Sequence, residues 1–276
     1  MSTVAIVTGA NQGLGLALVR QLCQDLGDPA VVYLTARDGE RGRTACRMFQ
    51  TEGLSPDFLT LDVGEDESVR ACALAVAELH GGVDVLVSNA GARIIPDRPK
   101  RDQVAEFVNV NNFGTTRILE AFEPMLRPGA RVVVVASSFG SLRQLDPALH
   151  PLFDGPLLTL GDIDRVTQDY AAAVRNGTAA AAGWPDWINV PSKISQVASM
   201  RIFARKMTAD RRDVLVTAAC PGLVDTDASR PWFPDMSHAQ SPAEAARDVA
   251  WLAAVPTPQS GLHGELVRHR QVIPWL

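Results

Sequence analysis

The feature that most constrains this fold is a glycine-rich turn that directly follows a short apolar run near the start of the chain. The run covers residues 4–7, and an apolar helical pattern begins after the turn, around Leu18. Glycines let the backbone turn tightly and approach a pyrophosphate at the helix N-terminus, where free N–H groups and the helix dipole favour an anion. The turn therefore predicts a dinucleotide site that contains Gly9, Asn11, Gln12, Gly13, Leu14 and Gly15.

Short apolar runs alternate with helical patterns along the rest of the chain, as in repeated strand–helix–strand units with a parallel sheet. Continuous valine, isoleucine and leucine runs are typical of strands that are buried on both faces. With 46% hydrophobic residues and no low-complexity linker, residues 1–276 predict one α/β domain with a doubly wound, Rossmann-type sheet. The expected strands are 4–7, 31–34, 58–61, 83–87, 131–135 and 214–218, with a short last strand near 266–267 after a helix at 242–253.

One stretch, at about 140–183, interrupts this alternation and is predicted to be a helical insertion. Ile163, Val166, Tyr170 and Val174 recur at helical spacing, and Thr159 with Asp162 forms a capping pattern before them. The alanine-rich residues 179–182 extend the helical tendency up to the terminating residues 183–185. The apolar position of Tyr170 predicts a core residue.

The glycine spacing, T-G-x-x-x-G-x-G over residues 8–15, resembles that of the short-chain dehydrogenase/reductase family. Further motifs along the whole chain support the resemblance. It implies that Asp62 and Val63 contact adenine and that Asn111 and Ser138 belong to the active site. It also implies cofactor contacts from the turn after the fourth strand and the loop over the nicotinamide, which contain Asn89, Ala90, Gly91, Pro221, Gly222, Val224 and Thr226.

Within this family the chain is most similar to the cytosolic NADPH-dependent carbonyl reductases. They share Thr-Ala-Arg-Asp after the second strand, here residues 35–38, a long insertion, and Gly-Trp-Pro at 183–185. An NAD site places an acid about 20 residues after the last glycine. Arg37 stands in that zone instead and can form a fork with a 2′-phosphate, with help from Arg41, so NADP(H) is the expected cofactor. Asp38 lies one residue late for an NAD site.

The resemblance also exposes a gap, because the family uses a tyrosine phenol as proton donor four residues before a lysine. Lys193 matches the lysine, but the tyrosine position is Asn189. The i,i+4 spacing puts both side chains on one helical face. The family pattern further implies a water, held by Asn111, that relays protons to Lys193. An amide can donate a hydrogen bond but cannot transfer a proton at neutral pH.

Three interpretations of Asn189 remain open from the sequence. The chain could reduce an activated carbonyl or quinone with an atypical proton donor, use bound NADP(H) without redox turnover, or bind the nucleotide only. In the simplest structural interpretation, Asn189 is a helix N-cap and Pro191 sits in the first turn. The catalytic residues predicted from the family pattern are Asn111, Ser138, Asn189 and Lys193.

Aromatic residues suggest an aromatic or polycyclic substrate. The loop at about 225–240 carries two of them among prolines and is predicted to be a mobile lid. The expected substrate residues are Phe139, Trp184, Trp187, Trp232 and Phe233.

The bulk properties narrow the classes of partner. A net charge of −5 argues against nucleic acid or an anionic membrane surface. The four cysteines are widely spaced, which predicts reduced thiols rather than a disulfide framework or a metal site. The run at 4–7 predicts a strand rather than a signal peptide, and no apolar run is long enough for a membrane helix. We expect a cytoplasmic monomer acting on a small molecule, since the insertion resembles the one that keeps carbonyl reductases monomeric.

Overall fold

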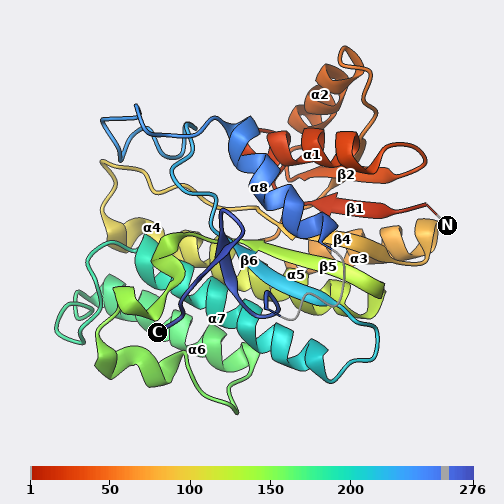
Figure 1. Ribbon diagram of the computed structural model, residues 1–276. Coiled ribbons are helices and arrows are strands. Elements are labelled where there is room, and N and C mark those ends of the chain that lie inside the picture. The colour runs from red at the N-terminus through yellow and green to blue at the C-terminus, as the bar shows by residue number, and fades with distance from the viewer. Residues whose placement is uncertain (1, 256–260) are drawn as a thin grey trace.

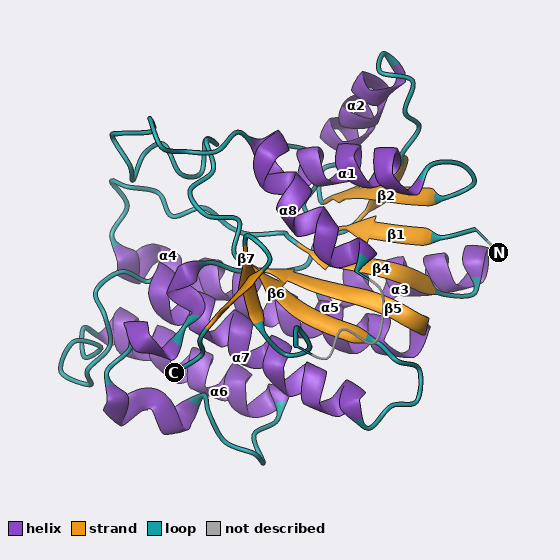
Figure 2. Cartoon of the chain, in the orientation of Figure 1, coloured by secondary structure: helices purple, strands orange, loops and turns teal. Residues whose placement is uncertain are grey.

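The computed structural model describes residues 2–255 and 261–276 and contains one eight-stranded sheet flanked by helices on both faces (Figures 1 and 2). The strand order is β3-β2-β1-β4-β5-β6-β7-β8; only the last pair, β7 with β8, is antiparallel. The strands are β1 Val4–Val7, β2 Val31–Ala36, β3 Asp57–Thr60, β4 Val83–Ser88, β5 Leu126–Val135, β6 Leu215–Ala219, β7 Leu266–Arg268 and β8 Gln271–Ile273. The predicted doubly wound α/β fold is confirmed.

Both faces of the sheet are apolar because successive side chains in a strand point to opposite sides. In β1, Val4 and Ile6 pack into one core, and Ala5 and Val7 pack into the other. The first core lies against α3 Asp66–His80, α5 Gly114–Phe122 and α7 Asn189–Thr208. The second lies against α1 Gly13–Leu26, α2 Gly39–Gln50 and α8 Pro242–Ala254. Double burial explains the continuous apolar runs of the strands.

Two strands differ most from the sequence expectation. β5 begins at Leu126, five residues before the apolar run on which the prediction relied, because parallel pairing with β4 continues through an irregular stretch. β8 was not predicted: it has only three residues, of which Gln271 and Val272 are exposed, so it carries no apolar signal. Its partner β7 supplies the pairing that defines it.

The segment 140–183 contains short 3₁₀ turns followed by α6 Leu160–Asn176. The side chain of Thr159 accepts from the N–H of Asp162, and the Asp162 carboxylate accepts from the N–H of Thr159, which is the capping box expected from the sequence. The expectation that residues 179–182 prolong the helix is wrong. Gly177 takes a left-handed conformation, with φ of 74°, and its N–H closes the last turn, so residues 179–182 form turns.

Helix α6 packs against α7 and against α4 Lys100–Val108. A third apolar cluster lies between α4 and α6 and contains Tyr170, which is buried as predicted. Between α4 and α5 the helix widens into a π-helical turn, Asn109–Phe113, which contains Asn111. Such widened turns often occur at functional sites.

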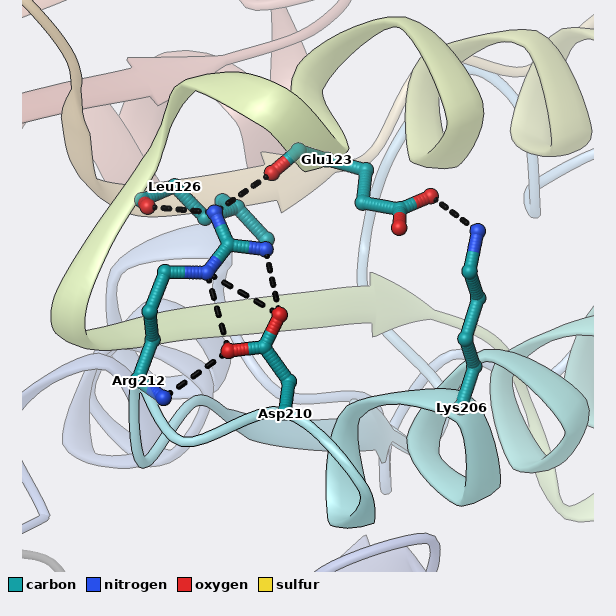
Figure 3. A network of polar contacts seen from close by, with 5 residues as sticks. All are labelled: Glu123, Leu126, Lys206, Asp210 and Arg212. Carbon is teal, nitrogen blue, oxygen red and sulfur yellow. Dashed lines mark hydrogen bonds and ion pairs between the residues drawn. The ribbon is translucent and has the colours of Figure 1, made fainter.

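Polar contacts anchor the C-terminal end of α7 to the start of β5 (Figure 3). Arg212 donates to the backbone oxygens of Glu123 and Leu126 over 2.9 and 2.8 Å and pairs with Asp210 over 2.7 Å. Lys206, on the last turn of α7, pairs with Glu123 over 2.5 Å. These contacts hold the C-terminal end of the helix that carries Lys193 against the sheet.

Candidate functional site

Two adjoining cavities lie at the carboxyl ends of the parallel strands, where ligands bind in open α/β sheets. The first, called here the glycine-turn pocket, has a volume of about 450 Å³. The second, the lysine pocket, has a volume of about 460 Å³. Ala92, Arg93 and Phe107 line both, so the two cavities are neighbours.

The cavities bring together most of the predicted site residues. The glycine-turn pocket is lined by Gly9, Asn11, Gln12, Arg37, Arg41, Asp62, Val63, Ala90 and Gly91. The lysine pocket is lined by Leu14, Ser138, Phe139, Trp187, Asn189, Lys193, Pro221, Gly222, Val224, Thr226, Trp232 and Phe233. Gly13, Gly15, Asn89, Asn111 and Trp184 line neither.

The glycine turn is built as close backbone approach requires. Gly9 has a φ of +61°, and a Cβ there would stand 2.7 Å from the Cα of Ala90. The side chain of Asn89 donates to the backbone oxygens of Thr8 and Gly9, which explains why Asn89 supports the turn rather than lining the pocket. Helix α1 then begins with no acidic residue in its first turn and no side-chain bond from its N-cap residue Gln12. Its N-terminal end therefore fits a pyrophosphate.

Asp38 is turned away from nucleotide recognition by a local contact. Its carboxylate is the N-cap of α2 and accepts from the N–H groups of Glu40 and Arg41, each over 3.0 Å. The bond from the N–H of Arg41 holds the pKa of Asp38 below its usual value. Asp38 does not line the glycine-turn pocket, whereas Arg37 and Arg41 do. The acid that complicated the cofactor prediction is thus occupied at the helix start.

Asn189 is the first residue of α7, and Lys193 follows one turn later. The suggestion that Asn189 is the N-cap is wrong, because Ile188 occupies that position and no side chain caps the helix. Pro191 lies in the first turn, where a missing N–H is tolerated. The Asn189 side chain therefore remains in the lysine pocket, half-buried, together with Ser138 and Lys193.

Lys193 projects from α7 toward the end of β5. Its Nζ donates to Gln196 Oε1 over 2.8 Å and to the backbone oxygen of Val135 over 3.3 Å. Burial lowers the pKa of Lys193 to about 8, with an opposing contribution from Cys220. The ammonium form is thus the main one at neutral pH, while the neutral form becomes accessible only slightly above it.

Both oxygens of Asn111 accept hydrogen bonds from protein groups. Its side-chain oxygen accepts from the N–H of Ala92 over 2.7 Å. Its backbone oxygen accepts from Gln196 Nε2 over 2.8 Å and from Thr115 Oγ1 over 2.7 Å. Gln196 therefore bridges Lys193 and Asn111 directly, between the two residues that the family pattern connects through a water. Gln196 lies three residues after Lys193, on the same helical face, and this spacing was the signal that the sequence analysis missed.

An aromatic wall surrounds the lysine pocket. The ring of Trp187 meets Phe139 edge-on at 4.9 Å between centroids and lies 6.2 Å from Trp232 and 6.5 Å from Phe233. Trp184 was expected in this wall, but it packs against Tyr170 and Phe153. It packs against the apolar cluster that contains Tyr170 of α6.

The loop after β6 is closed at its base. Asp225 N–H donates to the backbone oxygen of Gln240, and Gln240 N–H donates to that of Leu223. Trp232 and Phe233 stand between these tied ends and are partly buried. A Cβ at Gly13 would stand 3.6 Å from Thr226, so the start of this loop lies over the glycine turn.

Two arginines of the lysine pocket were not predicted. Arg93 and Arg268 line the lysine pocket, and none of its described lining residues is Asp or Glu. Arg93 faces Asp227 at 3.9 Å, a long contact between largely exposed groups. The position of Arg93 two residues after Gly91 could have indicated it. The cavity therefore favours anionic groups.

Other classes of site are not formed by the residues that the structure describes. Within 2–255 and 261–276, no cluster of three or more histidine, cysteine and acidic side chains could hold a metal ion. No helix in these ranges is long and apolar enough to cross a membrane. All four cysteines are free thiols.

The fold, the glycine turn and the two adjoining cavities define a dinucleotide-binding α/β protein. A family model described as short chain dehydrogenase matches residues 3–146. The carbonyl reductase [NADPH] 1 of Rattus norvegicus is 37% identical over 99% of this chain and 98% of its own length. The same-named protein of Homo sapiens is 36% identical over the same shares. The chain belongs to the short-chain dehydrogenase family of oxidoreductases.

Solved structures show the same fold at lower identity. Salutaridine reductase from Papaver somniferum superposes with a TM-score of 0.80 at 24% identity, covering 96% of this chain and 99% of its own. Menthone neomenthol reductase from Mentha piperita has a TM-score of 0.78, also at 24% identity, covering 96% of this chain and 98% of its own. A nicotinamide cofactor follows from the family, and the glycine turn described above fits its pyrophosphate.

Proposed function

We propose that the protein is an NADPH-dependent reductase of an activated carbonyl or quinone, with an aromatic or polycyclic substrate and an atypical proton donor. The observation that carries the proposal is the lysine pocket. Lys193, Ser138 and Asn189 share one cavity that adjoins the glycine-turn pocket and is walled by aromatic rings. The similarity to proteins named carbonyl reductase [NADPH] supports the reaction class.

The choice of NADPH over NADH is supported by the arginines of the glycine-turn pocket. Arg37 and Arg41 line the cavity, and Asp38 is held as a helix cap. An NAD site uses a carboxylate on the ribose 2′-OH, whereas a guanidinium matches a 2′-phosphate through two parallel bonds.

Each side chain of the lysine pocket has a role that its chemistry permits. The chemistry supplied by bound NADPH is hydride transfer to the carbonyl carbon, which leaves negative charge on the carbonyl oxygen. Ser138 and the Asn189 amide can donate hydrogen bonds to that oxygen, and the Lys193 ammonium stabilises its charge. Neither serine nor asparagine can give up a proton at neutral pH. A substrate whose reduced form is a stable anion, such as a quinone or a polarised diketone, needs no such proton in the transition state.

The charge of the cavity supports the same class of substrate. Arg93 and Arg268 add to Lys193, and no carboxylate stands among the described residues that line the pocket. Such a cavity stabilises the cofactor phosphates and an anionic product together. A plain ketone gives an alkoxide instead, which requires a positioned acid such as a phenol, and no tyrosine is among the described residues that line this pocket.

The test is NADPH oxidation against a matched panel of substrates. Quinones and aromatic 1,2-diketones should turn over, and acetophenone and simple aliphatic ketones should react at least about 10²-fold more slowly, since a positioned general acid contributes roughly 10²–10⁴ in rate. Lys193→Ala should abolish turnover of the good substrates. Equal rates for quinones and simple ketones, or turnover that survives Lys193→Ala, would overturn the proposal.

A second candidate, a protein that binds NADP(H) without turnover, is favoured by one observation. The chain has two tyrosines, and neither Tyr33 nor Tyr170 lines the lysine pocket. Tight NADPH binding by calorimetry, combined with no oxidation across the whole panel, would select this alternative or a non-redox use of the same site.

We further propose a monomer with a lid formed by residues 225–240. Helix α6 packs against α7 within the chain and so covers part of the helix that short-chain dehydrogenases commonly pair across subunits. Light scattering at micromolar concentration should give the mass of one chain, 29.6 kDa. Four free thiols agree with a reducing, cytoplasmic location, which imaging of the tagged protein tests.

A further inference from the structure

The side-chain amide of Gln196 is buried, and both its oxygen and its nitrogen form hydrogen bonds. Gln196 is 3% exposed. Its Oε1 accepts from Lys193 Nζ over 2.8 Å, and its Nε2 donates to the Asn111 backbone oxygen over 2.8 Å and to Thr115 Oγ1 over 3.2 Å. Both polar atoms of the amide therefore have partners.

The partners determine which way the amide points. With the oxygen and nitrogen exchanged, Nε2 would face the Lys193 ammonium and Oε1 would face the Asn111 carbonyl, so donor would meet donor and acceptor would meet acceptor. The orientation in which Gln196 accepts from Lys193 is therefore the one that satisfies every group.

The network closes the space behind Lys193. Thr115 Oγ1 donates to the same Asn111 oxygen over 2.7 Å, so that oxygen already has two donors. Asn111, Thr115 and Gln196 are all buried. A carboxamide does not take up and release protons at neutral pH, so this chain of bonds cannot carry a proton from solvent to the lysine. Two of the three ammonium hydrogens of Lys193 have acceptors, Gln196 and Val135, which leaves one for the cavity.

We propose that Gln196 is a positioning residue of this site: it ties Lys193 to the backbone of Asn111 and closes the route behind it, so that Lys193 acts toward the cavity as a fixed cation and not as part of a proton relay. Its consequence for turnover rests on the proposed reductase function, but the tie to Lys193 does not. Protons then reach the reduced substrate only through the mouth of the lysine pocket.

The surroundings of Lys193 make this role measurable. The titratable neighbour that acts on it is Cys220, just after β6, and Arg93 and Arg268 line the same cavity. The described lining of the pocket includes no carboxylate, and the nearest acceptor of the ammonium is the side-chain oxygen of Gln196, at 2.8 Å, ahead of the Val135 oxygen at 3.3 Å. Removing that oxygen should therefore lower the pKa of Lys193, and replacing the amide by a carboxylate should raise it.

The chain has only three lysines, Lys100, Lys193 and Lys206, so the experiment is carbon NMR of protein labelled with ¹³Cε-lysine, without cofactor. Lys193→Arg assigns the signal. In Gln196→Met, which has a similar shape but no amide, the pKa of Lys193 should fall by about one unit. In Gln196→Glu, a carboxylate replaces the amide and the pKa should rise by about 1–3 units.

A matched control is Ser195→Ala, on the neighbouring position of α7. Ser195 accepts from Thr167 over 3.0 Å and makes no contact with Lys193, so this change should leave the Lys193 titration as it is. Where turnover is measurable, the alkaline limb of the kcat profile should move down in Gln196→Met and up in Gln196→Glu, with KM little changed.

Equal pKa values of Lys193 in wild type, Gln196→Met and Gln196→Glu would overturn the proposal. If Gln196→Met does not fold, the upward move in Gln196→Glu alone decides it. If the Lys193 pKa moves in opposite directions in the two variants but none of the panel substrates supports NADPH oxidation, the positioning role is retained and the reductase function is rejected.

Discussion

A tyrosine at position 189 is the sharpest test of how this site handles protons. Asn189 begins α7, one turn before Lys193, and both side chains line the lysine pocket. In Asn189→Tyr, the phenol would enter a cavity of about 460 Å³ beside the Lys193 ammonium. A neighbouring cation lowers the pKa of a phenol, which makes it a better acid near neutral pH.

The size of the expected gain follows from general acid catalysis. A positioned acid contributes roughly 10²–10⁴ in rate, which corresponds to about 2.7–5.4 kcal/mol of transition-state stabilisation. The gain should be confined to simple ketones, because their alkoxide product needs the proton. Quinones, whose reduced forms are stable anions, should gain little or slow down as the ring fills the cavity.

The assay compares kcat/KM for acetophenone and for a quinone in wild type, Asn189→Tyr and Asn189→Phe. The phenylalanine variant has the same ring without the hydroxyl, so the ratio of the two variants isolates proton transfer from packing. Because the phenol acts in its protonated form, activity of Asn189→Tyr on ketones should fall as the pH rises through the phenol pKa. That limb should be absent in Asn189→Phe.

Equal kcat/KM values for Asn189→Tyr and Asn189→Phe on acetophenone, in variants that unfold at the wild-type temperature and bind NADPH, would refute the reasoning. A phenol at position 189 would then not reach the reacting carbonyl, and the absence of the family's tyrosine would not explain slow reduction of simple ketones.

Three further changes test other parts of the structure. Arg37→Ala should remove most of a preference for NADPH over NADH of about 1.5–3 kcal/mol, and equal dissociation constants of the unmutated protein for the two cofactors by calorimetry would contradict it. The hydroxyl of Tyr170 is buried without a partner, so Tyr170→Phe should keep activity and leave stability unchanged or raised by up to about 1 kcal/mol; a loss of turnover would instead make Tyr170 a displaced acid. Burial raises the pKa of Asp164 to about 6, against a bond from Thr116, so ionisation of the folded carboxyl costs stability as the pH rises from about 4 to 6. Asp164→Asn keeps the Thr116 bond and should raise the free energy of unfolding by roughly 1 kcal/mol at pH 7, since partial exposure screens the effect. Urea unfolding should show a smaller gain at pH 5.

The sequence by itself determined the sheet, the cofactor turn and the family. Strands such as β1 and β6 can be predicted from the sequence because burial on both faces requires continuous apolar runs. The glycine turn is legible because positive φ at Gly9 and the close approach of Ala90 exclude larger residues. The capping box of α6 is also local, since Thr159 and Asp162 are three residues apart.

Only the tertiary structure decided which side chains meet at the site. Trp184 and Trp187 are three residues apart, yet one packs under α6 and the other faces the lysine pocket. Asp38 stands near the expected NAD position but caps α2 instead. Gln196 and Asn111 are 85 positions apart, and their contact depends on the π-helical turn and on the packing of α7 against it. Periodicity and glycine spacing reflect the local conformation of the backbone, whereas contacts between side chains that are distant in sequence depend on how the helices pack on the sheet.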